Sequence, residues 1–323
     1  RRSRRQRQMC IRDRARMLQE MRSFFDDHGF CEVQPPCLSR DCVVDAYLDP
    51  LAVDAGQLAI SLPDLPRQFY LQTSPESAMK RMLVAGAPSI YSIGPVFRGG
   101  ERGDFHNPEF TMLEWYQLDA EMDAGVQLLG DLAIRLLGHD SYEVRRYRDV
   151  FRETLQLDPI DAEQTDLLDR ANAIDPQLAS SLASDRDSLL DLLFSRSIQP
   201  SLGVHRPMIV THYPSSQAAL AKTALDDPAC AARFELFASG IELANGYDEL
   251  RDPEVLMERY RHNQARRIAT GKTPMQLDTT LVLAMRAGLP QCSGVAMGVD
   301  RMLMARTRSS TIDEVLPFTI ERA

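Results

Sequence analysis

The stretch that most constrains this chain is VFRGGERGDFHNPEFTMLEWYQ, at residues 96–117. Its apolar ends predict two strands, and its polar, glycine-rich middle predicts a loop that joins them. Glycines at 99, 100 and 103 let the loop backbone approach a ligand closely. Arg98 stands where the first strand ends, so a cation lies at the start of this loop. The pattern therefore predicts a pair of neighbouring strands with a ligand-binding loop between them.

The second of these strands carries an unusual set of side chains on one face. Alternation with a period of two places Phe110, Met112, Glu114 and Tyr116 together. An aromatic ring, an acid and a phenol suit a pocket that stacks a flat ring and holds a cation. A solvated sheet face gives the same pattern, and the strand alone leaves both interpretations open.

A second stretch, FELFASGIELANGYDEL at residues 234–250, places acids in strands that otherwise look buried. Glu235 and Glu242 are seven residues apart, which puts them on opposite faces of an unbroken strand. Gly240 allows a turn or bulge that brings them to one side. Three further residues alternate onto one face: Asn245, Tyr247 and Glu249. Buried acids need a cation, a metal or a basic partner, and a metal–phosphate site with Mg²⁺ fits this pattern.

The third stretch, CSGVAMGVDRMLM at residues 292–304, predicts a strand, a glycine and then a helix. Gly298 precedes the helix, and Arg301 lies in its first turn. Helix N-termini and arginines both favour anions. Taken alone, close packing of a strand on a helix explains the pattern equally well.

The remaining periodicity predicts an α+β fold with an antiparallel or mixed sheet flanked by helices. Apolar residues at helical spacing predict an amphipathic helix at 15–28, which Gly29 ends. Strands are expected at 68–72, 89–97, 110–118, 207–212, 233–250 and 292–297, and helices at 75–85, 121–137, 253–269 and 278–287. We find no linker that would separate two domains.

Charge and composition narrow the functional classes. The 323 residues carry a net charge of −9, with 44% hydrophobic residues. The first sixteen hold eight arginines and one aspartate (+7), so the rest carries −16, which disfavours a broad nucleic-acid surface. For residues 1–14 we favour a disordered or non-native head over an RNA-binding arm. No apolar run is long enough for a membrane helix, and six cysteines without a C-x-x-C pair favour free thiols in the cytoplasm.

Taken in order, these stretches resemble the three motifs of class II aminoacyl-tRNA synthetases. GFCEVQPPCL (29–38) is similar to motif 1, with Pro36 as its proline. FRGGERGDFHNPEFTMLEWY is similar to motif 2, and SGVAMGVDRMLM to motif 3, with Arg301 as its arginine. HNPEFTMLEWY and ELANGYDEL resemble the lysyl-tRNA synthetase forms. The resemblance implies a catalytic domain at 15–323, with a variable helical insertion at 145–225, and a homodimer formed through motif 1.

Lysyl-tRNA synthetases carry an N-terminal domain that reads the anticodon, whereas here the first motif begins at residue 29. We therefore expect no anticodon-binding domain. A stand-alone core of this kind resembles the family of elongation factor P–(R)-β-lysine ligases. That resemblance implies activation of (R)-β-lysine by ATP, with Mg²⁺, and transfer to a lysine ε-amino group of elongation factor P.

The resemblance also implies a role for individual residues. The catalytic residues implied are Arg98 and Arg301. The ATP-binding residues implied are Arg98, Glu101, His106, Asn107, Phe110, Glu242, Leu243, Gly298 and Arg301. The substrate-binding residues implied are Ser74, Glu76, Glu114, Tyr116, Asn245, Glu249 and Ala296. The Mg²⁺ ligands implied are Glu235 and Glu242.

Two positions depart from the lysyl-tRNA synthetase pattern. Gly100 stands where those enzymes have a glutamate, so the adenine-side role of that residue falls to Glu101 or is lost. Ala296 stands where a glycine is expected, and one added methyl beside the substrate amine would disfavour α-lysine relative to β-lysine.

Two other functions compete with this hypothesis. The first is aminoacylation of tRNA, which the acidic body and the expected absence of an anticodon-binding domain disfavour. The second is an inactive, synthetase-like regulatory module. The presence of Arg98, Glu242, Glu249 and Arg301 argues against it, because a binding module does not need both ATP-binding and metal-binding groups.

Overall fold

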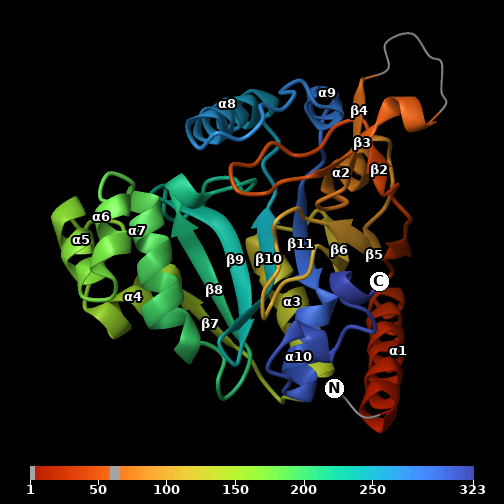
Figure 1. Ribbon diagram of the computed structural model, residues 1–323, viewed down its shortest axis with the longest axis horizontal. Helices are drawn as coiled ribbons and strands as arrows, with labels where there is room; N and C mark the ends of the chain where they lie inside the picture. The colour runs from red at the N-terminus through yellow and green to blue at the C-terminus, as the bar shows by residue number, and fades with distance from the viewer. Residues whose placement is uncertain (1–3, 59–65) are drawn as a thin grey trace. The chain divides into compact units, whose positions relative to one another are not determined.

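A computed structural model describes residues 4–58 and 66–323 of the protein (Figure 1). The chain forms two compact units, one of Arg1–Ala120 with Leu250–Ala323 and one of Glu121–Glu249. Both units combine helices with a mostly antiparallel sheet, as expected for the α+β class. Among the described helices, none is both long enough and apolar enough to cross a lipid bilayer.

The first unit holds two sheets. Its helices are α1 (Arg4–Asp27), α2 (Glu76–Val84), α8 (Pro253–Ala269), α9 (Thr280–Arg286) and α10 (Val299–Thr307). Its strands are β1 (Cys31–Glu32), β2 (Leu38–Ser39), β3 (Leu51–Asp54), β4 (Gln68–Leu71), β5 (Ile90–Phe97), β6 (Glu109–Leu118) and β11 (Cys292–Gly298). The larger sheet has the order β1-β5-β6-β11, with β1 parallel to β5 and the other pairs antiparallel. In the smaller sheet, β2-β4-β3, the strand predicted at 68–72 is confirmed as β4, whereas β2 and β3 were not predicted from the sequence.

Helix α1 packs its apolar stripe into the core of the first unit. Met17, Met21, Phe24 and Phe25 are at most 3% exposed, as the helical spacing predicted. Phe25 stacks on Tyr91 of β5, with ring centroids 4.7 Å apart. The helix begins at Arg4, earlier than the start expected at residue 15.

An ion pair inside the first unit joins three segments that lie far apart in the sequence. Asp300, at the start of α10, is 1% exposed and lies 2.5 Å from the Arg14 guanidinium of α1. Arg14 also donates to the Thr111 hydroxyl at 2.6 Å, and the Thr111 backbone N–H donates to Asp300 at 2.8 Å. A buried carboxylate needs such partners, because water cannot reach it. Arg14 therefore has a structural role that its place in the basic head did not reveal.

Replacing Arg14 by methionine removes this cation and leaves Asp300 buried without a counter-charge. We expect Arg14→Met to lower the free energy of unfolding by about 3 kcal/mol, measured by urea denaturation at pH 7. Arg16→Met is the matched control, because Arg16 is exposed on the same helix and loses the same charge. Equal stabilities of the two variants would contradict the structural role of Arg14.

The second unit is a four-stranded sheet with a cluster of short helices. Its helices are α3 (Met122–Leu137), α4 (Tyr147–Leu155), α5 (Gln164–Asn172), α6 (Pro176–Leu182) and α7 (Arg186–Leu193). Its strands are β7 (Glu143–Arg146), β8 (Met208–Pro214), β9 (Cys230–Ala238) and β10 (Ile241–Asp248), in the order β10-β9-β8-β7. Helices α4–α7 gather beside β7 and β8 (Figure 1). They share an apolar core with Val210, Tyr213 and Phe237 of the strands.

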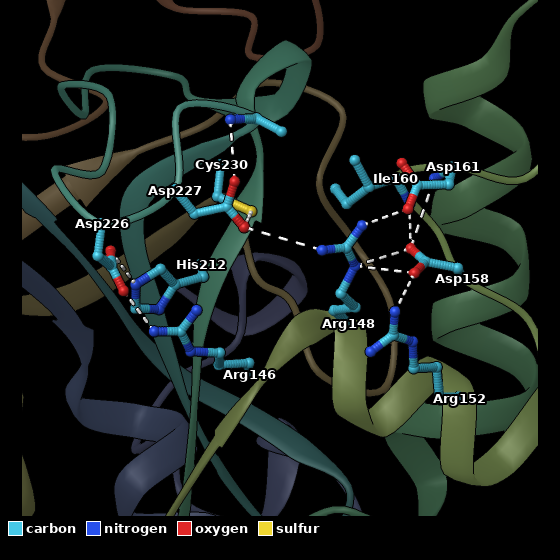
Figure 2. Close-up of polar contacts among 11 residues, drawn as sticks. Arg146, Arg148, Arg152, Asp158, Ile160, Asp161, His212, Asp226, Asp227 and Cys230 are labelled. Atoms are coloured by element: carbon cyan, nitrogen blue, oxygen red, sulfur yellow. Dashed lines mark hydrogen bonds and ion pairs between the residues drawn. The ribbon is translucent and has the colours of Figure 1, made fainter.

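A set of charged residues fastens α4 to the loops around it (Figure 2). Arg148 lies 2.9 Å from Asp158 and 2.6 Å from Asp161, and Arg152 also pairs with Asp158. Figure 2 also shows Arg146 and His212 on Asp226. Each of these arginines has a carboxylate partner, so the charges hold the helical insertion together and are not available to a ligand.

Candidate active site

The glycine-rich loop, residues 98–107, joins β5 to β6 in the first unit. Its ends are fixed by backbone hydrogen bonds: Arg98 donates to Pro108 at 2.8 Å, and Gly99 donates to Asp49 at 2.7 Å. Gly100 has a φ of +78°, a left-handed conformation that a side chain would strain. Further along, Gly103 and His106 pair through their backbones at 3.1 and 3.3 Å. The sequence prediction of strand, loop and strand is confirmed.

Cations surround this loop. Arg98 lies over the Phe110 ring, 5.2 Å from its centroid, and within 3.9 Å of the Glu101 carboxylate. Arg301, in the first turn of α10, donates to the Phe105 carbonyl at 3.2 Å and lies 2.5 Å from Nε2 of His106. Motif 3 therefore contacts motif 2 directly, as the resemblance implies.

The electrostatics of the loop favour an anion. Burial lowers the pKa of His106, and the neighbouring charges of Arg301 and Arg98 lower it further, although Glu101 acts in the opposite direction. A histidine is held neutral in this way where positive charge is in excess. A phosphate group would relieve that excess, so Arg98, His106 and Arg301 fit the phosphates of a nucleotide.

Four predicted substrate residues of the first unit form one hydrogen-bonded cluster. Glu114, 2% exposed on β6, accepts hydrogen bonds of 2.7 Å from the Ser74 and Tyr116 hydroxyls. The Ser74 hydroxyl also accepts from the backbone N–H of Glu76 at 3.1 Å, at the start of α2. Ala296 of β11 lies directly opposite Glu114 in the strand pair and so shares its face.

Lys80 completes this cluster, and our reading of the sequence missed it. Its ammonium lies 2.5 Å from the Glu76 carboxylate, one helical turn away, and 5.8 Å from the centroid of the Tyr116 ring. The side chain is 1% exposed. A Glu-x-x-x-Lys spacing on the helix predicted at 75–85 was the available signal.

The buried position of Glu114 changes its protonation. Burial, with the nearby charge of Glu76, raises its pKa from 4.5 to about 7, although Ser74, Tyr116 and Lys80 act in the opposite direction. The carboxyl is therefore about half ionised at neutral pH without a ligand. An ammonium group placed beside it would favour the ionised form, so the cluster is suited to bind a cation.

The raised pKa of Glu114 predicts how the stability of the protein depends on pH. The folded protein holds a proton on Glu114 between about pH 4.5 and 7, whereas the unfolded chain has released it. The free energy of unfolding must therefore fall by up to about 3 kcal/mol as the pH rises through this range, and it levels off at higher pH.

Glu114→Gln should remove that part of the pH dependence, measured as the free energy of unfolding from pH 4.5 to 8. Glu109→Gln is the control, because Glu109 is exposed on the same strand. A Glu114→Gln profile that runs parallel to the wild-type profile would contradict the assignment.

In the second unit, the predicted acidic residues lie on the hairpin β9–β10. Ser239 and Gly240 form its turn with φ values of +52° and +75°, as a tight two-residue turn requires. Asn245 pairs with Glu235, and Glu242 pairs with Phe237. The pairing shifts between Glu242 and Ala244, so one extra residue is accommodated in β10.

This bulge decides which way the side chains point. Glu235 and Phe237 share a face of β9, and their partners Asn245 and Glu242 share it with them. Without the extra residue, Glu242 and Asn245 would face opposite sides. The prediction that the strand break brings both acids to one side is confirmed, and the bulge is the part that the sequence did not reveal.

Glu235 is held firmly in place. It accepts hydrogen bonds of 2.5 Å from the Tyr213 hydroxyl and from the Arg233 guanidinium. Burial raises its pKa, and the nearby charge of Glu242 acts in the same direction, although Arg233 and the Tyr213 hydroxyl act in the opposite direction. Two carboxylates that repel one another in this way fit a Mg²⁺ ion, which takes oxygen ligands and often uses one or two carboxylates together with substrate phosphates. Within the described residues, no group of three or more metal-ligating side chains gathers around an ion-sized site.

The other predicted residues lie at the ends or edges of these elements. Asn107, 4% exposed, donates to the Glu109 carbonyl at 2.7 Å and accepts from the Ile320 N–H at 3.2 Å. Gly298 is the last residue of β11 and precedes α10. In the second unit, Leu243 is 2% exposed in β10, and Glu249 is 1% exposed and bridges to Ala221. The structure therefore groups the candidates of the first unit around β6, and those of the second around β9–β10.

Comparison with known proteins agrees with this geometry. Residues 1–322 match the family model of class II tRNA synthetases for D, K and N, so the chain belongs to the class II tRNA synthetase family. Among curated proteins, it is 39% identical to the elongation factor P–(R)-β-lysine ligase of Enterobacter sp. (strain 638). That match covers 313 residues, which are 96% of this chain and 94% of the relative.

Proposed function

We propose that this protein is an ATP-dependent ligase that joins (R)-β-lysine to a lysine ε-amino group of elongation factor P. The observation that carries the proposal is the buried acidic cluster around Glu114 of β6, together with the cations of the loop that leads into the same strand. Such an arrangement suits a ligand with ammonium groups at one end and a carboxylate that meets phosphate at the other. The similarity to the Enterobacter ligase over nearly the full length supports the same substrates.

The reaction has two steps. The carboxylate of β-lysine attacks the α-phosphate of ATP, which forms an aminoacyl-adenylate and releases pyrophosphate. The neutral ε-amine of the acceptor lysine then attacks the activated carbonyl, so that an amide forms and AMP leaves. Both steps need positioning and charge stabilisation and no protein nucleophile.

On this proposal, the residues of the glycine-rich loop bind ATP. Arg98 binds the α-phosphate and the substrate carboxylate, where negative charge develops. His106 and Arg301 contact the terminal phosphates, and Phe110 stacks with the adenine. Glu101 lies next to Arg98 and orients it, which gives this residue a role despite the glycine at position 100. Asn107 and Gly298 complete the nucleotide-binding set of the first unit.

The acidic residues have two remaining roles, which are to bind the amino groups of the substrate and to hold Mg²⁺. In the first unit, Glu114 and Tyr116 bind the distal ammonium of the substrate, whereas Ser74 and Glu76 bind its other amino group. Glu235 and Glu242 hold Mg²⁺, which when bound would neutralise charge on the phosphates. Tyr213 and Arg233 keep Glu235 oriented for that purpose.

ATP–pyrophosphate exchange tests the first step. With Mg²⁺ present, we expect exchange with (R)-β-lysine, weaker exchange with α-lysine, and none without an amino acid. For the second step, mass spectrometry of elongation factor P should show the addition of one β-lysyl group. Preference for α-lysine, together with charging of tRNA, would replace this proposal by tRNA aminoacylation. Failure to exchange with either amino acid would leave an inactive synthetase-like module.

Ala296 gives a test of substrate choice. Its methyl group shares a face with Glu114, so it occupies space beside the bound amine. We expect Ala296→Gly to raise activation of α-lysine relative to β-lysine by about tenfold, since one methyl group contributes about 1–3 kcal/mol to such discrimination. Val295→Ala is the control, because Val295 points to the other face of β11. An unchanged ratio of the two exchange rates would contradict this role.

A further inference from the structure

The glycine-rich loop has a composition that favours many backbone conformations. Glycines at 99, 100 and 103 leave it with a large backbone entropy in the absence of other contacts. Within the loop, the structure gives the backbone pairing of Gly103 with His106 and a backbone contact of Arg102 with Gly100 at 3.2 Å. Two side-chain contacts add to these: Arg102 donates to the Gly103 carbonyl at 3.1 Å, and Arg98 lies 3.9 Å from Glu101. A loop of this composition needs contacts with other segments to keep the conformation in which Arg98 and His106 can meet a nucleotide.

The C-terminal segment 311–322, which we call the strap, supplies such contacts. Arg102 of the loop donates to Glu321 at 2.7 Å through Nε and to Asp313 at 3.1 Å through Nη2. A guanidinium held by two carboxylates in this way is fixed in direction as well as in position. Arg102 and the two acids were not among the residues predicted from the sequence.

Two backbone contacts join the same segments. The Ile312 N–H donates to the Asp104 carbonyl at 2.7 Å, and the Ile320 N–H donates to the Asn107 side chain at 3.2 Å. Asn107 is buried and its amide also bonds the first residue of β6, so the strap reaches the end of the loop through it. The strap thus holds the loop at its middle and at its end.

An isolated ion pair at the surface contributes little to stability. Here the hydrogen bond from Arg102 also lowers the pKa of Glu321 to about 2, as expected for a well-formed pair. Together with the two backbone N–H contacts, the ion pairs of Arg102 join four residues of the strap to three residues of a ten-residue loop, so the contacts act on one segment collectively.

We propose that the strap holds the glycine-rich loop in its ATP-binding conformation, with Arg102, Asp313 and Glu321 as positioning residues. This inference rests on the proposed function, because it takes the loop as the ATP site. Its consequence is that ATP binds a loop that is already ordered, so less conformational entropy is lost on binding. Arg102 then acts through the loop and does not itself contact ATP.

The test uses the full chain and the variants Arg102→Gln, Asp313→Asn and Glu321→Gln. In ATP–pyrophosphate exchange, we expect KM for ATP to rise about fivefold in Glu321→Gln, with kcat and the KM for the amino acid nearly unchanged. The double variant of Arg102 and Glu321 should be no worse than Arg102→Gln alone, because that substitution already removes the bond to Glu321. Glu254→Gln is the control, since it breaks an exposed pair with Arg286 in the same unit.

Hydrogen exchange of the free protein gives a second measurement that does not depend on activity. We expect the amides of residues 99–107 to exchange faster in Glu321→Gln than in the wild type or in Glu254→Gln. If the wild type activates no amino acid, the proposed function fails, and the exchange of these amides still decides whether the strap orders the loop.

Two results would overturn the inference. One is unchanged exchange of the loop amides in all three strap variants. The other is a lower KM for ATP in Glu321→Gln, which would mean that the acid competes with ATP for Arg102 and that Arg102 is itself an ATP ligand.

Discussion

The first unit depends on the carboxylate of Asp300. It is buried at the start of α10, and it satisfies its charge with the Arg14 guanidinium of α1 and the Thr111 N–H of β6. Arg301 follows it directly in the chain, so the contact that fixes Asp300 also fixes the start of the helix that presents Arg301 to the loop. One buried ion pair and its hydrogen bonds in this way join helix α1 to motifs 2 and 3.

Burial shifts pKa values in opposite directions at the two ends of β6. At the loop, positive charges gather and the pKa of His106 falls, so the imidazole stays neutral among arginines. At the other end, the pKa of Glu114 rises because the carboxylate is desolvated and lies near Glu76. Each end thus keeps an electrostatic imbalance in the free protein, and the free energy needed to create it is recovered when a ligand of opposite charge binds.

Local patterns in the sequence were sufficient to predict much of the fold and of the candidate site. Alternation along residues 110–118 gave the face that carries Phe110, Glu114 and Tyr116, because a strand has a strict period of two. Helical spacing gave the buried face of α1, and Gly240 marked the hairpin turn of β9–β10. Periodicity indicates which face of a helix or strand is buried. These features could be predicted because each belongs to one element or one turn.

What the sequence did not reveal comes from contacts between distant segments. Arg14 looked like part of a polar head because its partner Asp300 lies 286 positions further along the chain. Arg102 looked like one more charge in a polar loop, since its partners belong to the strap. The bulge in β10 was hidden because one extra residue leaves no trace in composition. Pairings of this kind have no period, so they become visible only in three dimensions.

Strand β6 sets the distance between the cations of the loop and the acids around Glu114. From Phe110 to Glu114 the strand advances four residues, about 13 Å at 3.3 Å per residue. Cations stand at the first of these positions and acids at the last, so a ligand that lies along the strand meets positive charge at one end and negative charge at the other. An amino acid with a carboxylate at one end and an ammonium at the end of its side chain satisfies both charges in one orientation only. In the reverse orientation its ammonium would lie among arginines and its carboxylate beside Glu114, and the loss of both interactions would exclude that mode of binding. On the proposed function, the strand therefore selects the direction of the substrate as well as its charge, and it directs the carboxylate to the end where Arg98 is held.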